Sequence, residues 1–383
     1  MPAPLRPTHL VVNLTQLCLN LEAIRARVGP AEVMVMLKAN AYGHGVDGVA
    51  LSIEPFVDSI GVATLDEGIH LRGLGIKKPI LVAGGTLPGH VPHFLEYDLI
   101  LTAASPELLR AAESAAESAG KQLRVHLKID TGMERVGAHW DEAAPLLEAS
   151  LKLRHVDVDG IYTHFANAER PESRGMVRES GLTFASDQIA RFNEVLRFYE
   201  KRSLPLPRLR HAASSAAILN LSESYFDLVR PGLLFYGVYP GKDGLRSVQV
   251  RPALTWKSQV AFSKITPAGR GVSYGSRWHS DHAVRIATIP CGYADGYFRR
   301  MTNEARVIVN GRKYPQVGTI CMDQFMVDLE SDPAAVGDEA ILLGEAASGE
   351  QVTAEDLAAW AGTNSYEVLT NISARVPRVF VKE

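Results

Sequence analysis

The sequence predicts an α/β fold class, with a closed (β/α)8 barrel at the N-terminus followed by a mainly β C-terminal domain. Two observations predict this architecture. From about residue 30 to about residue 235, short apolar runs alternate with segments of helical spacing, whereas closely spaced strands dominate after Gly241. The length of 383 residues agrees, because chains of this size usually form more than one hydrophobic core.

The barrel strands are predicted from eight apolar runs. They lie at residues 33–37, 59–63, 79–83, 98–102, 123–129, 156–162, 209–213 and 226–229. The intervening segments have helical spacing or are rich in alanine, as in 106–119 and 184–199. Eight strands that alternate with helices over some 200 residues indicate a TIM-type barrel. An open doubly wound sheet remains as the alternative, because periodicity alone does not distinguish the two.

The C-terminal part is predicted to be a separate domain of residues 241–383. Closely spaced strands are expected over 247–265, 283–289, 305–309, 317–329 and 340–343, and one clear helix around 354–360. Residues 9–13 also have the pattern of a strand. We therefore expect residues 1–13 to join the C-terminal domain, which leaves residues 14–240 to the barrel.

Composition limits the classes of partner and the compartment. The formal net charge of −3 is too small to hold a polyanion, so nucleic acid is not expected as a partner. No window approaches 18 consecutive apolar residues, and no signal peptide is evident, so no membrane association is expected. The three cysteines (Cys18, Cys291 and Cys321) are far apart, which favours a reducing, cytoplasmic location. The two His-x-x-His pairs, at 90–93 and 279–282, lack neighbouring ligands, so no metal site is expected.

Polar side chains follow the predicted strands at the end of a barrel where active sites form. They are Lys38, Lys128, Arg135, Tyr162, Thr163, His164, His211, Ser214, Ser215 and Arg230. Each has a simpler interpretation: a solvated loop lysine, an N-cap serine, a surface arginine or a core histidine. Together they suggest a ligand, because Ser215 and the backbone of Gly232 would bind a phosphate and a nearby lysine would form a Schiff base. A phosphate and an imine-forming lysine indicate pyridoxal 5'-phosphate.

Nine motifs, in order along nearly the whole chain, resemble those of bacterial alanine racemases, which are fold-type III pyridoxal-phosphate enzymes. They are VMLKANAYGHG, KIDTGMERVG, THFANAE, HAASSAAIL, VRPGLLFYG, GVSYG, GYADGY, CMDQFMVDL and YEVLTNISARVPR. The resemblance implies a racemase that interconverts L-alanine and D-alanine with two bases and supplies D-alanine for cell-wall peptidoglycan. It also implies a homodimer with shared active sites.

The resemblance assigns the catalytic roles to two residues. Lys38 is expected to carry the cofactor and to serve as one base. Tyr274, in GVSYG, is expected to be the other base and to reach into the barrel of the partner subunit.

Further residues correspond to binding positions of the family. Arg230 is expected at the pyridine nitrogen, Arg135 near the cofactor's phenolic oxygen and the substrate, and His164 on the ring and against Arg230. The remaining expected cofactor contacts, most of them to the phosphate, are Tyr42, Ser214, Ser215, Gly232, Leu233 and Tyr366. The expected substrate contact is the backbone amide of Met322, and the expected access-channel residues are Tyr293 and Asp323.

Lys128 and Ser214 are two positions at which the resemblance implies a modification or shows a departure. Lys128 matches a lysine that is often carbamylated in the family; the alternative is that it leans outward and pairs with Asp130 or Glu134. Ser214 stands where the family commonly has asparagine. The substitution removes an amide that both donates and accepts, which puts the support of His164 and Arg230 in question.

Three alternative functions share parts of the pattern. A broad-specificity or serine racemase would share all the motifs. An amino acid decarboxylase of fold-type III has the same architecture, but the glycine triplet that would bind its phosphate is not seen here. A non-catalytic pyridoxal-phosphate carrier resembles the barrel alone, and the C-terminal domain with Tyr274 argues against it.

Overall fold

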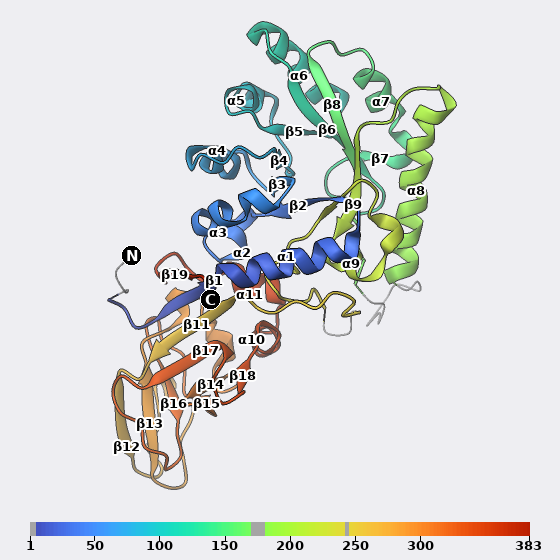
Figure 1. Ribbon diagram of the computed structural model, residues 1–383. Coiled ribbons are helices and arrows are strands. Elements are labelled where there is room, and N and C mark those ends of the chain that lie inside the picture. The colour runs from blue at the N-terminus through green and yellow to red at the C-terminus, as the bar shows by residue number, and fades with distance from the viewer. Residues whose placement is uncertain (1–4, 170–180, 242–244) are drawn as a thin grey trace. The chain divides into compact units, whose positions relative to one another are not determined.

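The computed structural model describes residues 5–169, 181–241 and 245–383, which form two compact units (Figure 1). One unit, the barrel unit, consists of residues 18–41 and 46–250. The other, the β unit, consists of the N-terminal residues up to 17, residues 42–45 and residues 251–383.

Within the described residues, the barrel unit contains a closed ring of eight parallel strands. In ring order they are β2 (Glu32–Met36), β3 (Ser59–Val62), β4 (Ile80–Val82), β5 (Ile100–Ala103), β6 (Leu123–Asp130), β8 (Val156–Tyr162), β9 (Leu209–Ser214) and β10 (Leu228–Arg230). The ring closes because β10 pairs with β2 and β5 pairs with β6. The predicted barrel is confirmed, and the open doubly wound sheet is excluded. A short strand, β7 (Ala138–His139), pairs in parallel with the end of β6.

The strands of the barrel are buried on both faces, as expected where helices cover a closed sheet. Every residue of β3, β4 and β5 is buried. The helices of this part of the chain are α1 (Leu14–Val28), α2 (Lys38–Tyr42), α3 (Val46–Ile53), α4 (Leu65–Gly73), α5 (Val91–Glu96), α6 (Pro106–Ala119), α7 (Ala144–Ser150), α8 (Gly181–Lys201) and α9 (Ser215–Asn220). Helix α6 has the predicted bounds because Ser105 caps its start and Gly120, with φ of 61°, ends it.

The β unit is built on a single sheet. The order of its strands is β12 (Phe262–Thr266), β13 (Val284–Ile289), β16 (Phe325–Asp328), β15 (Arg312–Val317), β14 (Arg306–Val309), β17 (Glu339–Glu345), β11 (Leu254–Gln259), β1 (His9–Asn13) and β19 (Arg378–Val381), with β18 (Gln351–Val352) on β17. The N-terminal strand β1 pairs antiparallel with β11 and parallel with β19. Two short helices, α10 (Ala354–Ala361) and α11 (Ser365–Thr370), follow β18.

Three predictions for the β unit are wrong in detail. The strand expected over 317–329 is interrupted, because β15 ends at Val317 and β16 begins at Phe325. Gly318 causes the break: its φ is 73°, and a Cβ there would lie 2.6 Å from the carbonyl oxygen of Val272. The strand expected from 247 begins only at Leu254. A second helix, α11, was not predicted.

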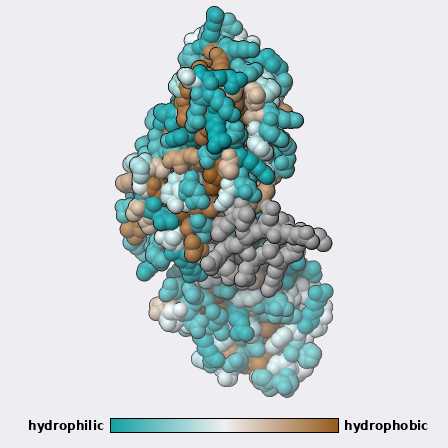
Figure 2. Space-filling model, turned by 90° about the vertical axis from the view of Figure 1, so that its right-hand side faces the viewer, coloured by the Kyte–Doolittle hydropathy of each residue, from teal (hydrophilic) through white to brown (hydrophobic). Residues whose placement is uncertain are grey.

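None of the helices in the described residues is long and apolar enough to cross a membrane. The face drawn in Figure 2 is largely hydrophilic, with hydrophobic residues in small groups between the charged ones.

Candidate active site

Cationic and hydroxyl side chains gather at the C-terminal ends of the barrel strands, where βα loops form active sites. Their positions are Lys38 after β2, Lys128 in β6, Arg135 after β6, His164 after β8, His211 in β9, Ser215 after β9 and Arg230 at the end of β10. Because all eight strands are parallel, these side chains belong to the same end of the barrel.

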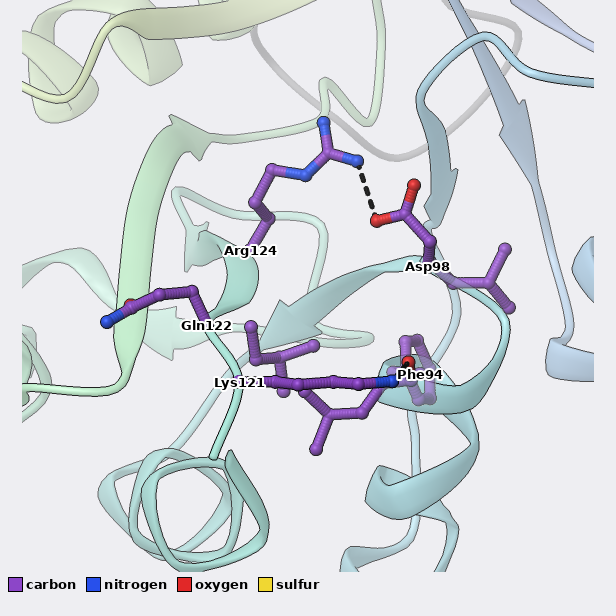
Figure 3. Close-up of a pocket in the computed structure, with 8 residues that line it drawn as sticks. Phe94, Asp98, Lys121, Gln122 and Arg124 are labelled. Carbon is purple, nitrogen blue, oxygen red and sulfur yellow. Dashed lines mark hydrogen bonds and ion pairs between the residues drawn. The ribbon is translucent and has the colours of Figure 1, made fainter. Parts of the chain in front are cut away.

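The opposite end of the barrel carries a different kind of site. A pocket of about 300 Å³ lies where β5 and β6 begin. Arg124 reaches across part of it and donates a hydrogen bond of 3.1 Å to Asp98 (Figure 3). Its lining residues are Phe94, Leu95, Asp98, Leu99, Lys121, Gln122, Leu123 and Arg124. None of the predicted site residues is among them, so this pocket is separate from the candidate active site.

Lys38 has the environment of a reactive amine. Its side chain is half-buried. Burial, followed by the positive charge of Arg135, lowers the pKa of Lys38, while Glu67 opposes the shift. A larger fraction of its amino group is therefore unprotonated at neutral pH, as a Schiff-base lysine requires.

The backbone directly after Lys38 is in an unusual conformation. Residues 39–42, which form most of α2, all have φ between 51° and 55°, so this segment is a left-handed turn of four non-glycine residues and not a regular α-helix. The turn is held where the amide of Ala39 donates to Glu67 Oε1 at 2.7 Å and where Asn40 Oδ1 accepts from the amide of Val46 at 2.7 Å. Each left-handed residue costs about 1 kcal/mol. Such strain is typical of functional sites, and here it adjoins the candidate nucleophile.

Arg230 is buried and is held by groups that carry no negative charge. It donates to His211 Nδ1 at 2.6 Å, to the carbonyl oxygen of Thr163 at 2.9 Å, to that of Ala212 at 3.0 Å and to His164 Nδ1 at 3.4 Å. Burial lowers the pKa of Arg230 to about 10, so it remains a cation at neutral pH. The predicted contact between His164 and Arg230 is present. His211, which sequence analysis placed at a strand end without a role, makes the shortest bond.

Ser215 presents a hydroxyl group in a buried turn. Its Oγ accepts from the amides of Gly232 at 2.9 Å and Leu234 at 3.2 Å. Both acceptor sites of the hydroxyl are then used, which leaves its proton to donate to a ligand. Ser214 stands at the N-cap of α9 without capping it through its side chain. Arg230 is therefore supported by histidines and carbonyl groups, without the amide that Ser214 replaces.

Lys128 is buried inside the barrel unit. Its Nζ lies 4.4 Å from the centre of the Tyr162 ring. Burial, together with the charges of Arg230 and Arg135, lowers the pKa of Lys128 well below its ordinary value, and Asp130 only partly opposes the shift. The lowered pKa leaves a larger fraction of the Lys128 amine unprotonated and so able to react with carbon dioxide.

The alternative of an outward-facing Lys128 is wrong. The carboxylate of Asp130 accepts hydrogen bonds from backbone amides within residues 132–135. Glu134 instead lies 3.1 Å from His139. Neither acid is paired with Lys128 among the ion pairs of the described residues.

In the β unit, Tyr274 projects from a loop that is held rigidly at its base. Its side chain is 73% exposed. Its carbonyl oxygen accepts from Thr319 Oγ1 at 2.7 Å, and Ser273 Oγ donates to the carbonyl oxygen of Thr319 at 2.5 Å. A fixed loop with an exposed phenol is suited to presenting a proton-transfer group to a ligand.

Two further tyrosines of the β unit lie close together. The ring centres of Tyr42 and Tyr366 are 6.2 Å apart, at an angle of 47°. The chain between them is tightly packed, since a Cβ at Gly43 would lie 2.1 Å from the carbonyl oxygen of Leu369. This packing requires glycine after Tyr42.

The predicted access-channel residues lie on two adjoining loops of the β unit. The amide of Tyr293 donates to the carbonyl oxygen of Cys321 at 3.0 Å. Tyr293 and Met322 are 41% and 51% exposed. Asp323 accepts from Arg375 at 2.7 Å, a partner that the sequence did not reveal.

The sequence also did not reveal the polar side chains that are linked to Arg230 through His211. His126 and Asp159 lie in the same polar cluster, on β6 and β8. A signal was available: His126 and Lys128 are two residues apart on one strand, and such residues point to the same face.

The donor set fits pyridoxal phosphate. Ser215 offers a proton to a phosphate group, Arg230 offers one to a ring acceptor, and Lys38 offers an amine to an aldehyde. Two of the three charged groups that shift the pKa of Lys38, Arg135 and Arg230, are cations, which suits an anionic cofactor.

Comparison with known proteins gives the same result. The chain matches the model of the alanine racemase N-terminal domain over residues 12–240 and that of the C-terminal domain over residues 253–380. It is 44% identical to the alanine racemase of Carboxydothermus hydrogenoformans, over 98% of this chain and 100% of that protein, and 42% identical to that of Chlorobaculum tepidum, over 98% and 95%. The crystal structure of alanine racemase from the D-cycloserine producer Streptomyces lavendulae matches it with a TM-score of 0.90 at 35% identity, over 99% of this chain and 98% of that one. The chain belongs to the alanine racemase family.

Proposed function

We propose that this chain is an alanine racemase that binds pyridoxal 5'-phosphate at the C-terminal end of its barrel and interconverts L-alanine and D-alanine. In the cell this reaction supplies D-alanine for peptidoglycan. The observation that carries the proposal is the group formed by Lys38, Ser215 and Arg230, which offers an amine, a hydroxyl and a guanidinium at one end of the barrel. When bound, the cofactor withdraws electrons from the substrate's Cα and so makes its proton removable.

Lys38 is proposed to bind the cofactor and to move a proton at Cα on one face. Its lowered pKa supports this role, because a base must be largely unprotonated to accept a proton. Tyr274 is proposed to move the proton on the opposite face. Its exposure and its fixed loop support a contribution to the barrel of a partner subunit, in a homodimer with shared sites.

Arg230 is proposed to orient the cofactor ring. A guanidinium only donates hydrogen bonds, so a ring nitrogen that meets it accepts a bond and stays unprotonated. His164 is proposed to pack on the ring beside Arg230, to which it lies within 3.4 Å.

The remaining binding roles follow from the positions of donors. The phosphate contacts are proposed to come from Tyr42, Ser214, Ser215, Gly232, Leu233 and Tyr366, with the buried Ser215 hydroxyl as the principal donor. Arg135 and the amide of Met322 are proposed to bind the substrate carboxylate. Tyr293 and Asp323 are proposed to line the access channel.

Lys128 is proposed to be carbamylated. Its neutral amine would attack carbon dioxide, form an N–C bond and release one proton, which gives a carbamate. The product carries a negative charge that suits the neighbouring Arg135 and Arg230. A carbonyl resonance from ¹³C-labelled carbon dioxide, absent in Lys128→Met, would support this; no resonance in the wild type would contradict it.

The location is proposed to be cytoplasmic. Cys18, Cys291 and Cys321 form no disulfide bond in the structure. Cysteines that are not oxidised to disulfides are typical of a reducing compartment.

The function is tested with Lys38→Ala. The wild type should racemise alanine, followed by chiral chromatography, and should gain activity from added pyridoxal phosphate. Lys38→Ala should lose both racemisation and the covalent cofactor adduct that borohydride fixes in the wild type. Lys121→Ala, at the opposite end of the barrel, is the control and should keep both. A wild type without racemisation, or a Lys38→Ala protein with a reducible adduct, would contradict the proposal.

A further inference from the structure

A chain of polar side chains leads from Arg230 through the barrel unit to its other end. Arg230 is bonded to His211 Nδ1, and His211 Nε2 lies 2.9 Å from His126 Nδ1. His126 Nε2 lies 3.8 Å from Asp159 Oδ2. Asp159 in turn accepts two hydrogen bonds from Arg208, at 2.8 and 3.0 Å. The chain joins β10, β9, β6 and β8, and both histidines are fully buried.

Arg230 fixes the direction of the hydrogen bonds at His211 and between His211 and His126. A guanidinium has no acceptor, so His211 Nδ1 must carry a lone pair. Burial lowers the pKa of His211 well below its ordinary value, so the ring is neutral and its proton is on Nε2. That proton is donated to His126 Nδ1. His126 is neutral for the same reason, so its own proton is on Nε2 and points toward Asp159.

The far end of the chain therefore needs an acceptor, and Asp159 supplies one. His126 Nε2 is buried without a hydrogen-bond partner within bonding distance among the described residues, and the carboxylate 3.8 Å away is the charge that it faces. The pairing of Asp159 with His126 and Arg208 holds the pKa of that carboxyl well below its usual range. Asp159 is thus ionised at neutral pH.

The place of His126 is also built into the backbone. Gly160 is paired with His126 across β6 and β8, and a Cβ at Gly160 would lie 2.7 Å from three atoms of the imidazole ring. The ring fills the space of a side chain on the neighbouring strand. The second histidine, His211, is held by Tyr162, whose ring stacks on it with the ring centres 4.5 Å apart. Neither histidine is free to turn.

We propose that Asp159 is a positioning residue for the candidate active site, which acts through His126 and His211 to keep an acceptor facing Arg230. This inference rests on the proposed function in so far as Arg230 orients the cofactor. The structure contains no carboxylate bonded to Arg230 itself in the described residues. The negative charge that orders the chain is therefore placed two imidazole rings away, where it leaves the ring-binding face of Arg230 as a pure donor.

Asp159→Asn reverses the chain. Arg208 only donates, so it keeps one bond to the amide oxygen of the new asparagine and loses the other, and the NH2 group turns to His126. His126 Nε2 then accepts, so the one proton of His126 sits on Nδ1 and is donated in a hydrogen bond to His211 Nε2. The proton of His211 is forced to Nδ1, where it meets the N–H of Arg230, and the 2.6 Å bond is lost.

The test is the tautomeric state of the histidines in the full-length protein labelled with ¹⁵N-histidine. Two-bond ¹⁵N–¹H correlations distinguish a proton on Nδ1 from one on Nε2, and His126→Gln and His211→Gln assign the signals. The wild type should show Nε2–H for both rings, with or without pyridoxal phosphate. Asp159→Asn should shift His211 toward Nδ1–H. A wild-type spectrum with Nδ1–H on either ring, or unchanged tautomers in Asp159→Asn, would overturn the proposal.

Kinetics supply a second readout and a matched control. Asp227 forms a two-bond pair with Arg210 on the adjoining strand, at 2.6 and 2.8 Å, and the pair touches no histidine in the hydrogen bonds of the described residues. Asp159→Asn should lower kcat by roughly tenfold, the effect of losing an outer partner at ligand-orienting histidines, with KM for alanine nearly unchanged. Asp227→Asn should leave both nearly unchanged. Equal losses in the two variants would overturn the proposal. If the tautomers shift as described but the wild type does not racemise alanine, the proposed function fails and the positioning role of Asp159 stands.

Discussion

At the scale of single residues, the barrel unit gains its chemistry by burying cations and imidazoles that water would otherwise solvate. Lys38, Lys128 and Arg230 all have lowered pKa values because burial disfavours their charged forms. The same burial keeps His211 and His164 neutral. The site thus combines reactive amines with the permanent cations of Arg135 and Arg230, at a cost to stability.

That cost should appear in the dependence of stability on pH. Burial lowers the pKa of His126, His164 and His211 below the ordinary value, so the unfolded chain binds more protons than the folded one as the pH falls. The stability that these neutral histidines contribute is present above about pH 6.5, the pKa of an unfolded histidine, and is lost progressively as the pH falls below it. Between pH 7 and pH 5.5, the free energy of unfolding in urea should fall by about 1 kcal/mol for each of these histidines.

The control is His90→Gln, a change at an exposed position, which should keep the same fall. An equal free energy of unfolding at pH 7 and pH 5.5 in the wild type would show that these histidines are not held neutral.

At the scale of elements, the sequence predicted the regular pieces better than the loops that carry function. Strand β1 and helix α6 have the predicted bounds because alternation, a serine N-cap and a glycine C-cap are local signals. The loop between β15 and β16 was missed, because the break at Gly318 depends on Val272, 46 residues earlier, and local patterns do not contain that contact. Helix α11 was missed because it is a single short segment, set by the Asn364 cap.

The loop after Gly318 gives a prediction with a closely matched control. Gly318 and Gly269 both have φ of 73°. A Cβ at Gly269 would have no neighbour within 4 Å, whereas a Cβ at Gly318 would lie 2.6 Å from the carbonyl oxygen of Val272. Gly269→Ala should cost only the backbone strain, about 1 kcal/mol. Gly318→Ala should cost more and displace the Tyr274 loop, since Thr319 bonds both Ser273 and Tyr274.

The measurements are urea unfolding and racemisation of alanine for the two variants. Similar stability and similar kcat in both would mean that the contact with Val272 does not hold the loop.

At the scale of the whole molecule, the residues proposed for the site are divided between two units. Lys38, Arg230 and Ser215 belong to the barrel unit, while Tyr274 and Met322 belong to the β unit. Sequence motifs marked most of these positions, because each lies at a strand end or in a short loop with an unusual composition. They did not predict which atoms bond, since the partners of Arg230 come from strands that are distant in the chain.

If a site takes Lys38 from one subunit and Tyr274 from another, inactive variants should complement each other. Lys38→Ala and Tyr274→Phe, each nearly inactive alone, should regain racemisation after mixing and subunit exchange, because a mixed dimer holds one site with both residues. Exchange is verified by native mass spectrometry. Exchanged but inactive mixtures would show that each chain completes its own site.

The central claim is that Lys38 and Tyr274 move protons on opposite faces of the substrate. The most direct measurement is incorporation of solvent deuterium into Cα, starting separately from L-alanine and D-alanine, in the wild type and in Tyr274→Phe. We predict that Tyr274→Phe loses exchange far more from one enantiomer than from the other, because only the Lys38 face keeps its base. Equal loss from both enantiomers would contradict it.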